Sequence, residues 1–389
     1  MKYSALALAL LALSACTDDV RAPLEPDVAA PLLSRGEGGD DDERGSDAPG
    51  VVFTLSNQTA GNEVLAFTRA ANGRLTQSSS YATGGTGTGG GLGSQGAVVF
   101  TRDGRFLLAV NAGSNDISSF RVRPQGLELL DRVASGGMRP ISVTSVRGVV
   151  YVLNAGGAGN ISGFRINNAG RLSPISGSAQ SLSSAASGPA QIEFDEWGTR
   201  LVVTEKATNI IASYRVDPAG RASNGVFSPS AGQTPFGFTF RNNILLVSEA
   251  VGGAPDASVA SSYRLRADGS VSVISAAVPT TETAACWFVV TGNGKFGYVS
   301  NTGSGTVTGY GVNSAGRLER LDNNGETAVI GAGTSPIDMA LSGNSRYLYV
   351  LNSGTETISA LRVRSNGSLA VLDGGVSGLP NGAVGLAAK

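Results

Sequence analysis

Two glutamates and one arginine are the residues best placed by type and spacing to do chemistry. Glu205 and Glu249 each follow a short apolar run, and Arg139 directly precedes Pro140. Neighbouring carboxylates can act as a general base with a charge partner, or hold a cation, while an arginine binds an anion. The alternatives stay open: each glutamate instead hydrogen-bonds a turn backbone, and Arg139 is an ordinary surface residue.

The sequence contains no histidine. This excludes Ser-His-Asp and Cys-His catalysis, imidazole-ligated zinc and a histidine general base. The chemistry that remains belongs to carboxylates, arginine, lysine, tyrosine and the backbone.

The elements that must position these residues follow from a sevenfold repeat. Each repeat has a β-rich run, a polar anchor, a Gly-rich turn and a second β-rich run. The anchors are separated by 54, 43, 51, 44, 52 and 51 residues, and they are Asn57, Asn111, Asn154, Glu205, Glu249, Asn301 and Asn352. A period near 50 residues built from short strands is typical of a β-propeller with one four-stranded blade per repeat. The fold class is therefore predicted as all-β, with a single seven-bladed propeller over residues 50–389.

The two ends of the chain predict how the ring closes. The segment 51–57 has the pattern of a second strand with no first strand before it, whereas 380–386 has the pattern of a first strand with no second strand after it. We therefore expect the C-terminal strand to join the N-terminal blade, because such closure removes free sheet edges.

The N-terminal segment is predicted to be a targeting signal. Lys2 precedes an apolar run over residues 5–13 that is too short to span a bilayer, and the run ends in Leu13-Ser14-Ala15-Cys16. That ending resembles the bacterial lipoprotein signal, which implies removal of residues 1–15 and lipidation of Cys16. Each buried methylene of an acyl chain contributes about 0.8 kcal/mol, so several chains anchor a protein stably. Residues 16–49, rich in Pro, Asp, Glu and Gly, are expected to form a disordered tether.

Composition and charge limit the classes of molecule that the protein is expected to bind. The formal net charge is -1 and 15% of residues are charged, so neither charge nor aromatic patterning indicates nucleic-acid binding. The segment 85–90 matches a dinucleotide fingerprint, but a strand rather than a helix is expected after it, so the match indicates a loop. We expect a monomer with no cofactor and no metal.

Three repeats carry a family resemblance: Tyr151-Val152-Leu153-Asn154, Tyr298-Val299-Ser300-Asn301 and Tyr349-Val350-Leu351-Asn352. With the proline-led strands that begin most repeats, they resemble the lactonase-type seven-bladed propellers. This family includes 6-phosphogluconolactonase, carboxymuconate-cyclising enzymes and Tyr-Val-Thr-Asn repeat surface proteins. The resemblance implies that catalysis uses a histidine directly after the proline that begins an inner strand, together with Glu and Arg around the central channel. Here the prolines are followed by Ile141, Ala190, Phe236 and Ile337 instead, and these motifs specify fold better than activity.

Two functional classes follow. The first is a lipid-anchored propeller of the cell envelope, in the outer membrane or facing the periplasm if the host is Gram-negative, which binds an envelope protein, a glycan or a small ligand at one ring face. The second is an extracytoplasmic lactone hydrolase or cyclising enzyme that uses Glu205 or Glu249 as base and Arg139 as anion partner. Because histidine is absent, the binding module is the favoured prediction.

Overall fold

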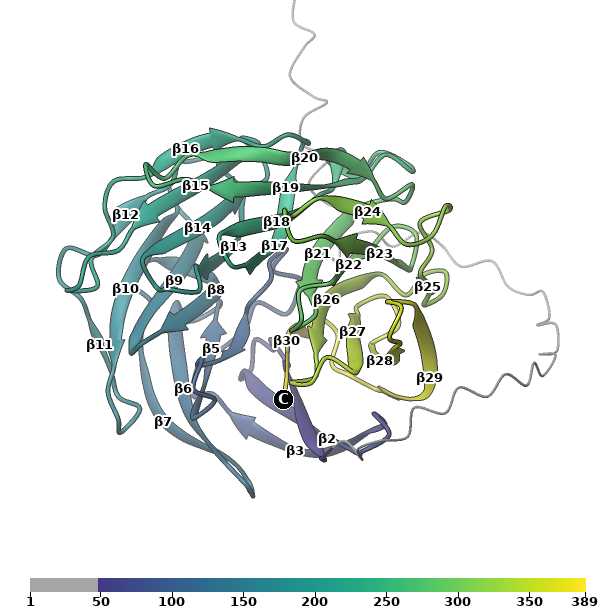
Figure 1. The fold of residues 1–389 in the computed structure, drawn as a ribbon. Helices are drawn as coiled ribbons and strands as arrows, with labels where there is room; N and C mark the ends of the chain where they lie inside the picture. Colours follow the sequence, from purple (N-terminus) through teal and green to yellow (C-terminus); the bar gives the residue numbers. More distant parts are fainter. Residues whose placement is uncertain (1–47) are drawn as a thin grey trace, which may run out of the picture.

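Seven antiparallel blades surround a central axis in the computed structural model, which describes residues 48–389. The first strand of each blade lies nearest the axis and the last strand forms the rim (Figure 1). The predicted all-β, seven-bladed propeller is thus confirmed. Within the described range the structure has a single short 3-10 helix, η2 (Val251–Gly253).

The strands of the first four blades are, from the axis outward, β30 (Val384–Ala388), β1 (Gly50–Leu55), β2 (Glu63–Arg69) and β3 (Leu75–Ala82); β4 (Val98–Phe100), β5 (Phe106–Asn111), β6 (Asp116–Arg123) and β7 (Gly126–Ala134); β8 (Met138–Val146), β9 (Val149–Gly156), β10 (Asn160–Ile166) and β11 (Leu172–Pro174) with β12 (Gln180–Ser181); and β13 (Pro189–Phe194), β14 (Arg200–Glu205), β15 (Ile210–Arg215) and β16 (Val226–Pro229).

The strands of the last three blades are β17 (Pro235–Arg241), β18 (Ile244–Glu249), β19 (Val259–Leu265) and β20 (Val271–Pro279); β21 (Ala285–Val290), β22 (Phe296–Asn301), β23 (Thr306–Val312) and β24 (Leu318–Arg320) with β25 (Ala328–Val329); and β26 (Pro336–Leu341), β27 (Tyr347–Asn352), β28 (Thr357–Val363) and β29 (Leu369–Ser377). In blades three and six the rim strand is divided into two short pieces, both paired with the third strand.

The ring closes through the C-terminal strand, as the sequence predicts. β30 pairs antiparallel with β1 and completes the sheet β3-β2-β1-β30. The Thr54 hydroxyl also donates to the carbonyl oxygen of Gly385 at 2.6 Å. The first blade is therefore made from both ends of the described chain, and the inner edge of β1 is paired.

The tyrosines of the repeat motif join neighbouring blades. Tyr151 and Tyr298, on second strands, donate to the carbonyl oxygens of Gly220 and Gly367, each at 2.8 Å. Each glycine lies in the turn between the third and fourth strands of the following blade and has a positive φ, of 83° and 87°. Because these tyrosines are fully buried, the hydrogen bonds satisfy polar groups that would otherwise be costly to bury.

The seven polar anchors lie at the ends of the second strands or within two residues of those ends, and all are 0–1% exposed. They define one face of the ring, called here the anchor face. The turns between first and second strands define the opposite face, called here the hairpin face.

No helix within residues 48–389 is long and apolar enough to cross a membrane. The predicted signal peptide, Cys16 and most of the tether lie outside the described residues.

Candidate functional site: the central cavity

Glu205 is held by the loop that precedes its own blade. Its carboxylate accepts a hydrogen bond from the Ser183 amide at 2.9 Å and others from the hydroxyls of Ser183 and Thr208. The residue is fully buried. These contacts correspond to the alternative in which the glutamate fixes loop backbone and hydroxyls.

Glu249 makes a similar cluster one blade further on. It accepts hydrogen bonds from the hydroxyls of Ser230 and Tyr263, both at 2.6 Å, and of Ser261 at 2.5 Å. It too is fully buried. The structure gives the two glutamates separate sets of donors, and neither lines the central cavity described below. Their catalytic assignment stays a prediction.

Arg139 is exposed on the anchor face. Its backbone N–H donates to the Asn115 side chain at 2.7 Å, and its guanidinium reaches the Gly91 carbonyl oxygen at 3.5 Å. Its φ of 51° lies in the left-handed region, which is uncommon for arginine. Arg139 therefore lies beside the Gly-rich loop 84–97 rather than in the central cavity.

The Gly-rich loop 84–97 crosses the ring axis at the anchor face. The Ser94 hydroxyl donates to Ile141 O at 2.8 Å, and the Trp287 indole donates to Ser94 O at 3.1 Å. Lys206 Nζ donates to Gly93 O at 2.6 Å and lies 4.4 Å from the centre of the Phe236 ring. Burial lowers the pKa of Lys206 to about 7, and the charge of Arg139 acts in the same direction. As predicted, the segment 85–90 forms a loop with no helix after it.

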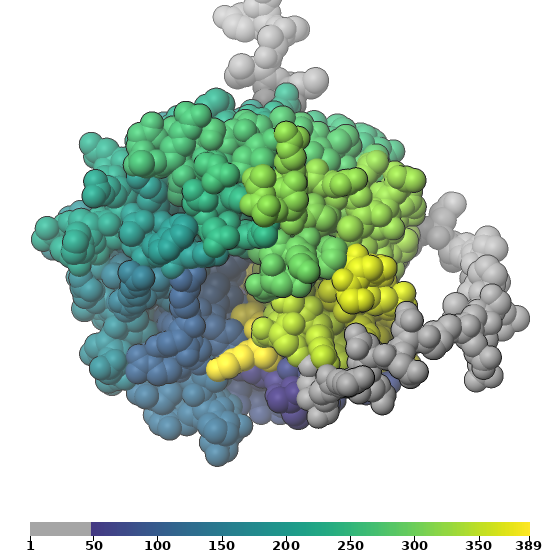
Figure 2. Space-filling model, viewed as in Figure 1, coloured from purple at the N-terminus to yellow at the C-terminus, as the bar shows by residue number. Residues whose placement is uncertain are grey.

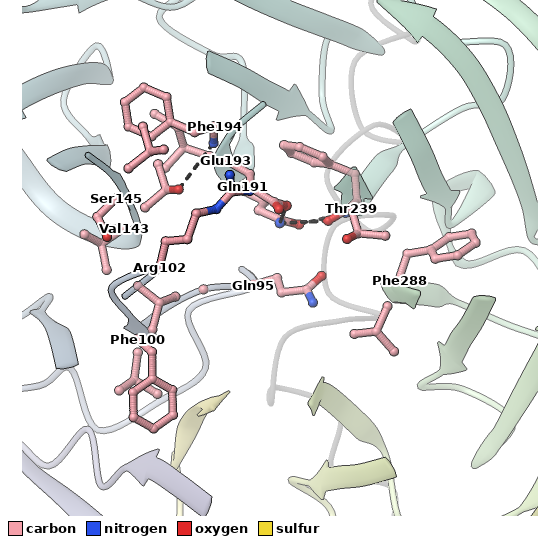
Figure 3. Close-up of a pocket in the computed structure, with 18 of the residues that line it drawn as sticks. Gln95, Phe100, Arg102, Val143, Ser145, Gln191, Glu193, Phe194, Thr239 and Phe288 are labelled. Carbon is pink, nitrogen blue, oxygen red and sulfur yellow. Dashed lines mark hydrogen bonds between the residues drawn. The ribbon is translucent and has the colours of Figure 1, made fainter. Parts of the chain in front are cut away.

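Beneath this loop the centre of the ring is hollowed (Figure 2). A cavity of about 320 Å³ is lined by residues of the inner strands together with Gln95 of the loop and Arg102 after β4. A volume of this order suits a small molecule. Gln95, Arg102, Gln191, Glu193 and Thr239 all reach toward the open centre (Figure 3).

Glu193, on β13, is the titratable group at the wall of this cavity. Removal from water raises the pKa of its carboxyl to about 8; the charge of Arg102 opposes that shift and the charge of Glu196 adds to it. Gln191, two residues earlier on the same strand, donates to Glu193 Oε2 at 3.1 Å and to Phe238 O at 2.8 Å. Glu193 is therefore largely protonated at neutral pH and held in place by a glutamine that also binds the next blade.

Three further polar atoms at the cavity have no hydrogen-bond partner among the described residues: Gln95 Oε1, Ser145 Oγ and Asp338 Oδ2. Asp338 is 1% exposed, and burial raises the pKa of its carboxyl well above the usual range. Buried polar groups are nearly always paired with protein or solvent. These three atoms are therefore the places at the cavity wall where the protein leaves hydrogen-bonding capacity unused.

Sequence reasoning did not select Glu193, Gln191 or Asp338, although a signal was present. Alternate residues of a strand face the same side, so Gln191 and Glu193 place two polar side chains on one face of an inner strand. Asp338 interrupts an otherwise apolar inner strand. Polar residues in inner strands could thus have pointed to the cavity.

Within residues 48–389 no group of three histidine, cysteine, aspartate or glutamate side chains could hold a metal ion.

Comparison with known proteins supports the fold. Residues 60–183 match the family model described as Lactonase, 7-bladed beta-propeller. No curated protein matches the chain. Among solved structures, a proposed 6-phosphogluconolactonase from Bacteroides uniformis is 19% identical with a TM-score of 0.70, covering 89% of this chain and 100% of that one.

Two further structures are similar. A proposed 6-phosphogluconolactonase from Bacteroides fragilis is 18% identical with a TM-score of 0.68, covering 90% of this chain and 100% of its own. The periplasmic gluconolactonase of Pseudomonas aeruginosa is 15% identical with a TM-score of 0.63, covering 87% and 99%. At such identities the likeness concerns the fold alone. Residues 60–183 therefore resemble the lactonase propellers in sequence, and the described chain as a whole has the fold of a seven-bladed β-propeller.

Proposed function

We propose that this protein is a lipid-anchored binding propeller of the cell envelope, and that its central cavity holds a small hydroxylated molecule. The observation that carries the proposal is the polar wall with unpaired atoms: Gln95 Oε1, Ser145 Oγ and Asp338 Oδ2. A ligand rich in hydroxyl groups can donate to the Gln95 oxygen and can both donate to and accept from the Ser145 hydroxyl and the Asp338 carboxyl, whose pKa burial raises. Such pairing relieves the cost of leaving these groups without partners. Anchoring through Cys16 rests on the sequence signal alone.

The state of Glu193 favours an uncharged ligand. A carboxyl with a pKa of about 8 is mostly neutral at pH 7, so it can both donate and accept a hydrogen bond. Sugars and sugar lactones have this chemistry.

Lactone hydrolysis is the second candidate, and the raised pKa of Glu193 favours it. The ionised fraction of a carboxyl with a pKa near the working pH is an effective general base, and this fraction grows as the pH rises toward 8. A base of this kind requires no histidine. Water would add to the lactone carbonyl while Glu193 takes its proton. The ring C–O bond would then break, and Glu193 would return the proton to the departing ring oxygen.

The experiment is titration calorimetry of the purified full-length chain with a panel of aldonolactones, the corresponding acids and neutral sugars, followed by hydrolysis in a pH-stat. The variants are Glu193→Ala, which removes the carboxyl, and Glu193→Gln, which keeps a neutral donor and acceptor but cannot act as a base. The comparison variant is Glu205→Gln combined with Glu249→Gln. Binding that weakens in Glu193→Ala supports the cavity as the site, and hydrolysis abolished in Glu193→Gln makes the protein an enzyme. Activity lost only in the double variant would instead assign the catalytic role to Glu205 and Glu249. No binding by any compound refutes the proposal.

A further inference from the structure

A second hollow lies on the hairpin face, between blades two and three. It has a volume of about 690 Å³ and is formed by three turns. One turn joins β4 to β5, one joins β8 to β9, and one follows β10. We call this hollow the arginine groove. It meets the mouth of the central cavity, because Arg102 and Ser145 line both.

The charge of the arginine groove is strongly one-sided. Four of its lining residues are arginines, Arg102, Arg105, Arg147 and Arg165, and one, Asp103, is acidic. Taken together they give a formal charge of +3 in a protein whose net charge is -1. Concentrated positive charge in a concave site attracts and retains anions.

Most of this charge is not neutralised within the protein. Asp103 pairs with Arg105 at 2.6 Å. Among residues 48–389, neither Arg102, Arg147 nor Arg165 has a carboxylate within 4 Å. Arg102 donates to the carbonyl oxygen of Glu196, and Arg165 donates to that of Pro218 at 3.3 Å. These backbone contacts orient two guanidinium groups and leave most of their five N–H donors available.

Arg147 occupies a position where the turn itself favours another residue. It forms the two-residue turn between β8 and β9 with Gly148, and its φ of 49° lies in the left-handed region. The corresponding turn in blade five carries Asn242 with a φ of 54°. Asparagine tolerates this conformation better than arginine does, so the backbone does not explain the arginine. Its guanidinium adds a positive charge to the lining of the groove.

We propose that the arginine groove binds a small oligoanion, a molecule with at least two carboxylate or phosphate groups. Guanidinium groups form paired, charge-assisted hydrogen bonds with both kinds of group. A hollow of this volume suits a small molecule. The groove shares Arg102 and Ser145 with the central cavity, whereas Arg147 and Arg165 line only the groove. The proposal does not depend on the function proposed for the central cavity.

The test is titration calorimetry of the full-length chain with citrate, pyrophosphate and the monoanion gluconate. The variants are Arg147→Asn, which keeps a residue suited to the turn, and Arg165→Gln. The matched control is Arg215→Gln, because Arg215 holds the same exposed strand position in blade four, outside the groove. Each groove variant is expected to raise the dissociation constant about three- to tenfold, and the control to leave it unchanged. Melting curves confirm that all variants fold.

Citrate and pyrophosphate distinguish a carboxylate ligand from a phosphate ligand, and tighter binding of either supports the proposal. Affinity should fall with added salt, since the interaction is electrostatic. Three results would overturn the proposal: no binding of either oligoanion, equal affinity for gluconate, or equal weakening in Arg215→Gln and Arg147→Asn.

Discussion

Removal of residues 379–389 tests how much the closing strand stabilises the ring. The deletion takes away β30 and leaves the inner edge of β1 without a partner. It also removes the paired contacts between Val51 and Lys389, whose amides and carbonyls exchange hydrogen bonds at 3.1 and 2.9 Å. The first blade would then be a three-stranded sheet open toward the axis.

The expected loss follows from the side chains that this segment buries. Leu379, Val384 and Leu386 are 4–7% exposed, and Ala383 and Ala387 are also buried. At about 2 kcal/mol for each large side chain and about 0.5 for each alanine, the apolar contribution is about 7 kcal/mol. Unfolding entropy is about 2.1 cal/mol/K per residue, so a ring of roughly 340 residues loses about 0.7 kcal/mol per degree. The melting temperature should therefore fall by about 10 °C.

Differential scanning calorimetry of the truncated and intact chains measures this shift. A milder variant, Leu386→Ala, should cost about 2–4 kcal/mol. Val371→Ala is its control, because Val371 on β29 is 53% exposed. A synthetic peptide of residues 379–389 should restore part of the lost stability, whereas a scrambled peptide should not. If the truncated chain melts within about a degree of the intact one, the closure argument is wrong.

Three further predictions concern single side chains. Tyr151→Phe leaves the Gly220 carbonyl without its donor and should cost about 1–2 kcal/mol in denaturant melts; no loss would show that water replaces the hydroxyl. For Lys206, the folded pKa of about 7 lies below the ordinary 10.5, so the unfolded chain binds more protons between these values and stability should rise with pH across that window. Lys206→Met should remove this rise in melts over the same range, and an unchanged profile would contradict the assignment. Glu249→Gln should destabilise the chain by about 1–3 kcal/mol, because an amide cannot accept all three hydroxyl donors as well as a carboxylate does; equal stability would mean that the cluster is not structural.

The catalytic histidine that the resemblance to lactonase propellers implies is absent from this sequence, and the structure shows what the proline-led strands carry instead. Residues after those prolines, such as Ile141 and Phe236, are buried in the core. The polar groups at the axis come from other positions, Gln191, Glu193 and Asp338. A binding or hydrolytic role for this chain therefore has to rest on its own cavity.

The sequence by itself determined the ring. Repeat spacing, period-two alternation and glycine turns are local signals, and the unmatched strand patterns at the two ends predict the closure that β30 and β1 make. The tyrosines of the repeat could also be placed on second strands. Their hydrogen-bond partners, the carbonyls of Gly220 and Gly367 in the next blade, could not be predicted from the sequence, because the packing of neighbouring blades decides which turn lies against each tyrosine side chain.

Only the tertiary structure decided which polar residues share a site. Glu205 and Glu249 are prominent in the sequence because they break the asparagine pattern, yet the fold gives each its own set of hydroxyl donors. Glu193 and Arg102 come from different blades and meet only because the ring brings the inner strands around one axis. A pKa near 8 then follows from removal of the carboxyl from water, and desolvation depends on every blade at once.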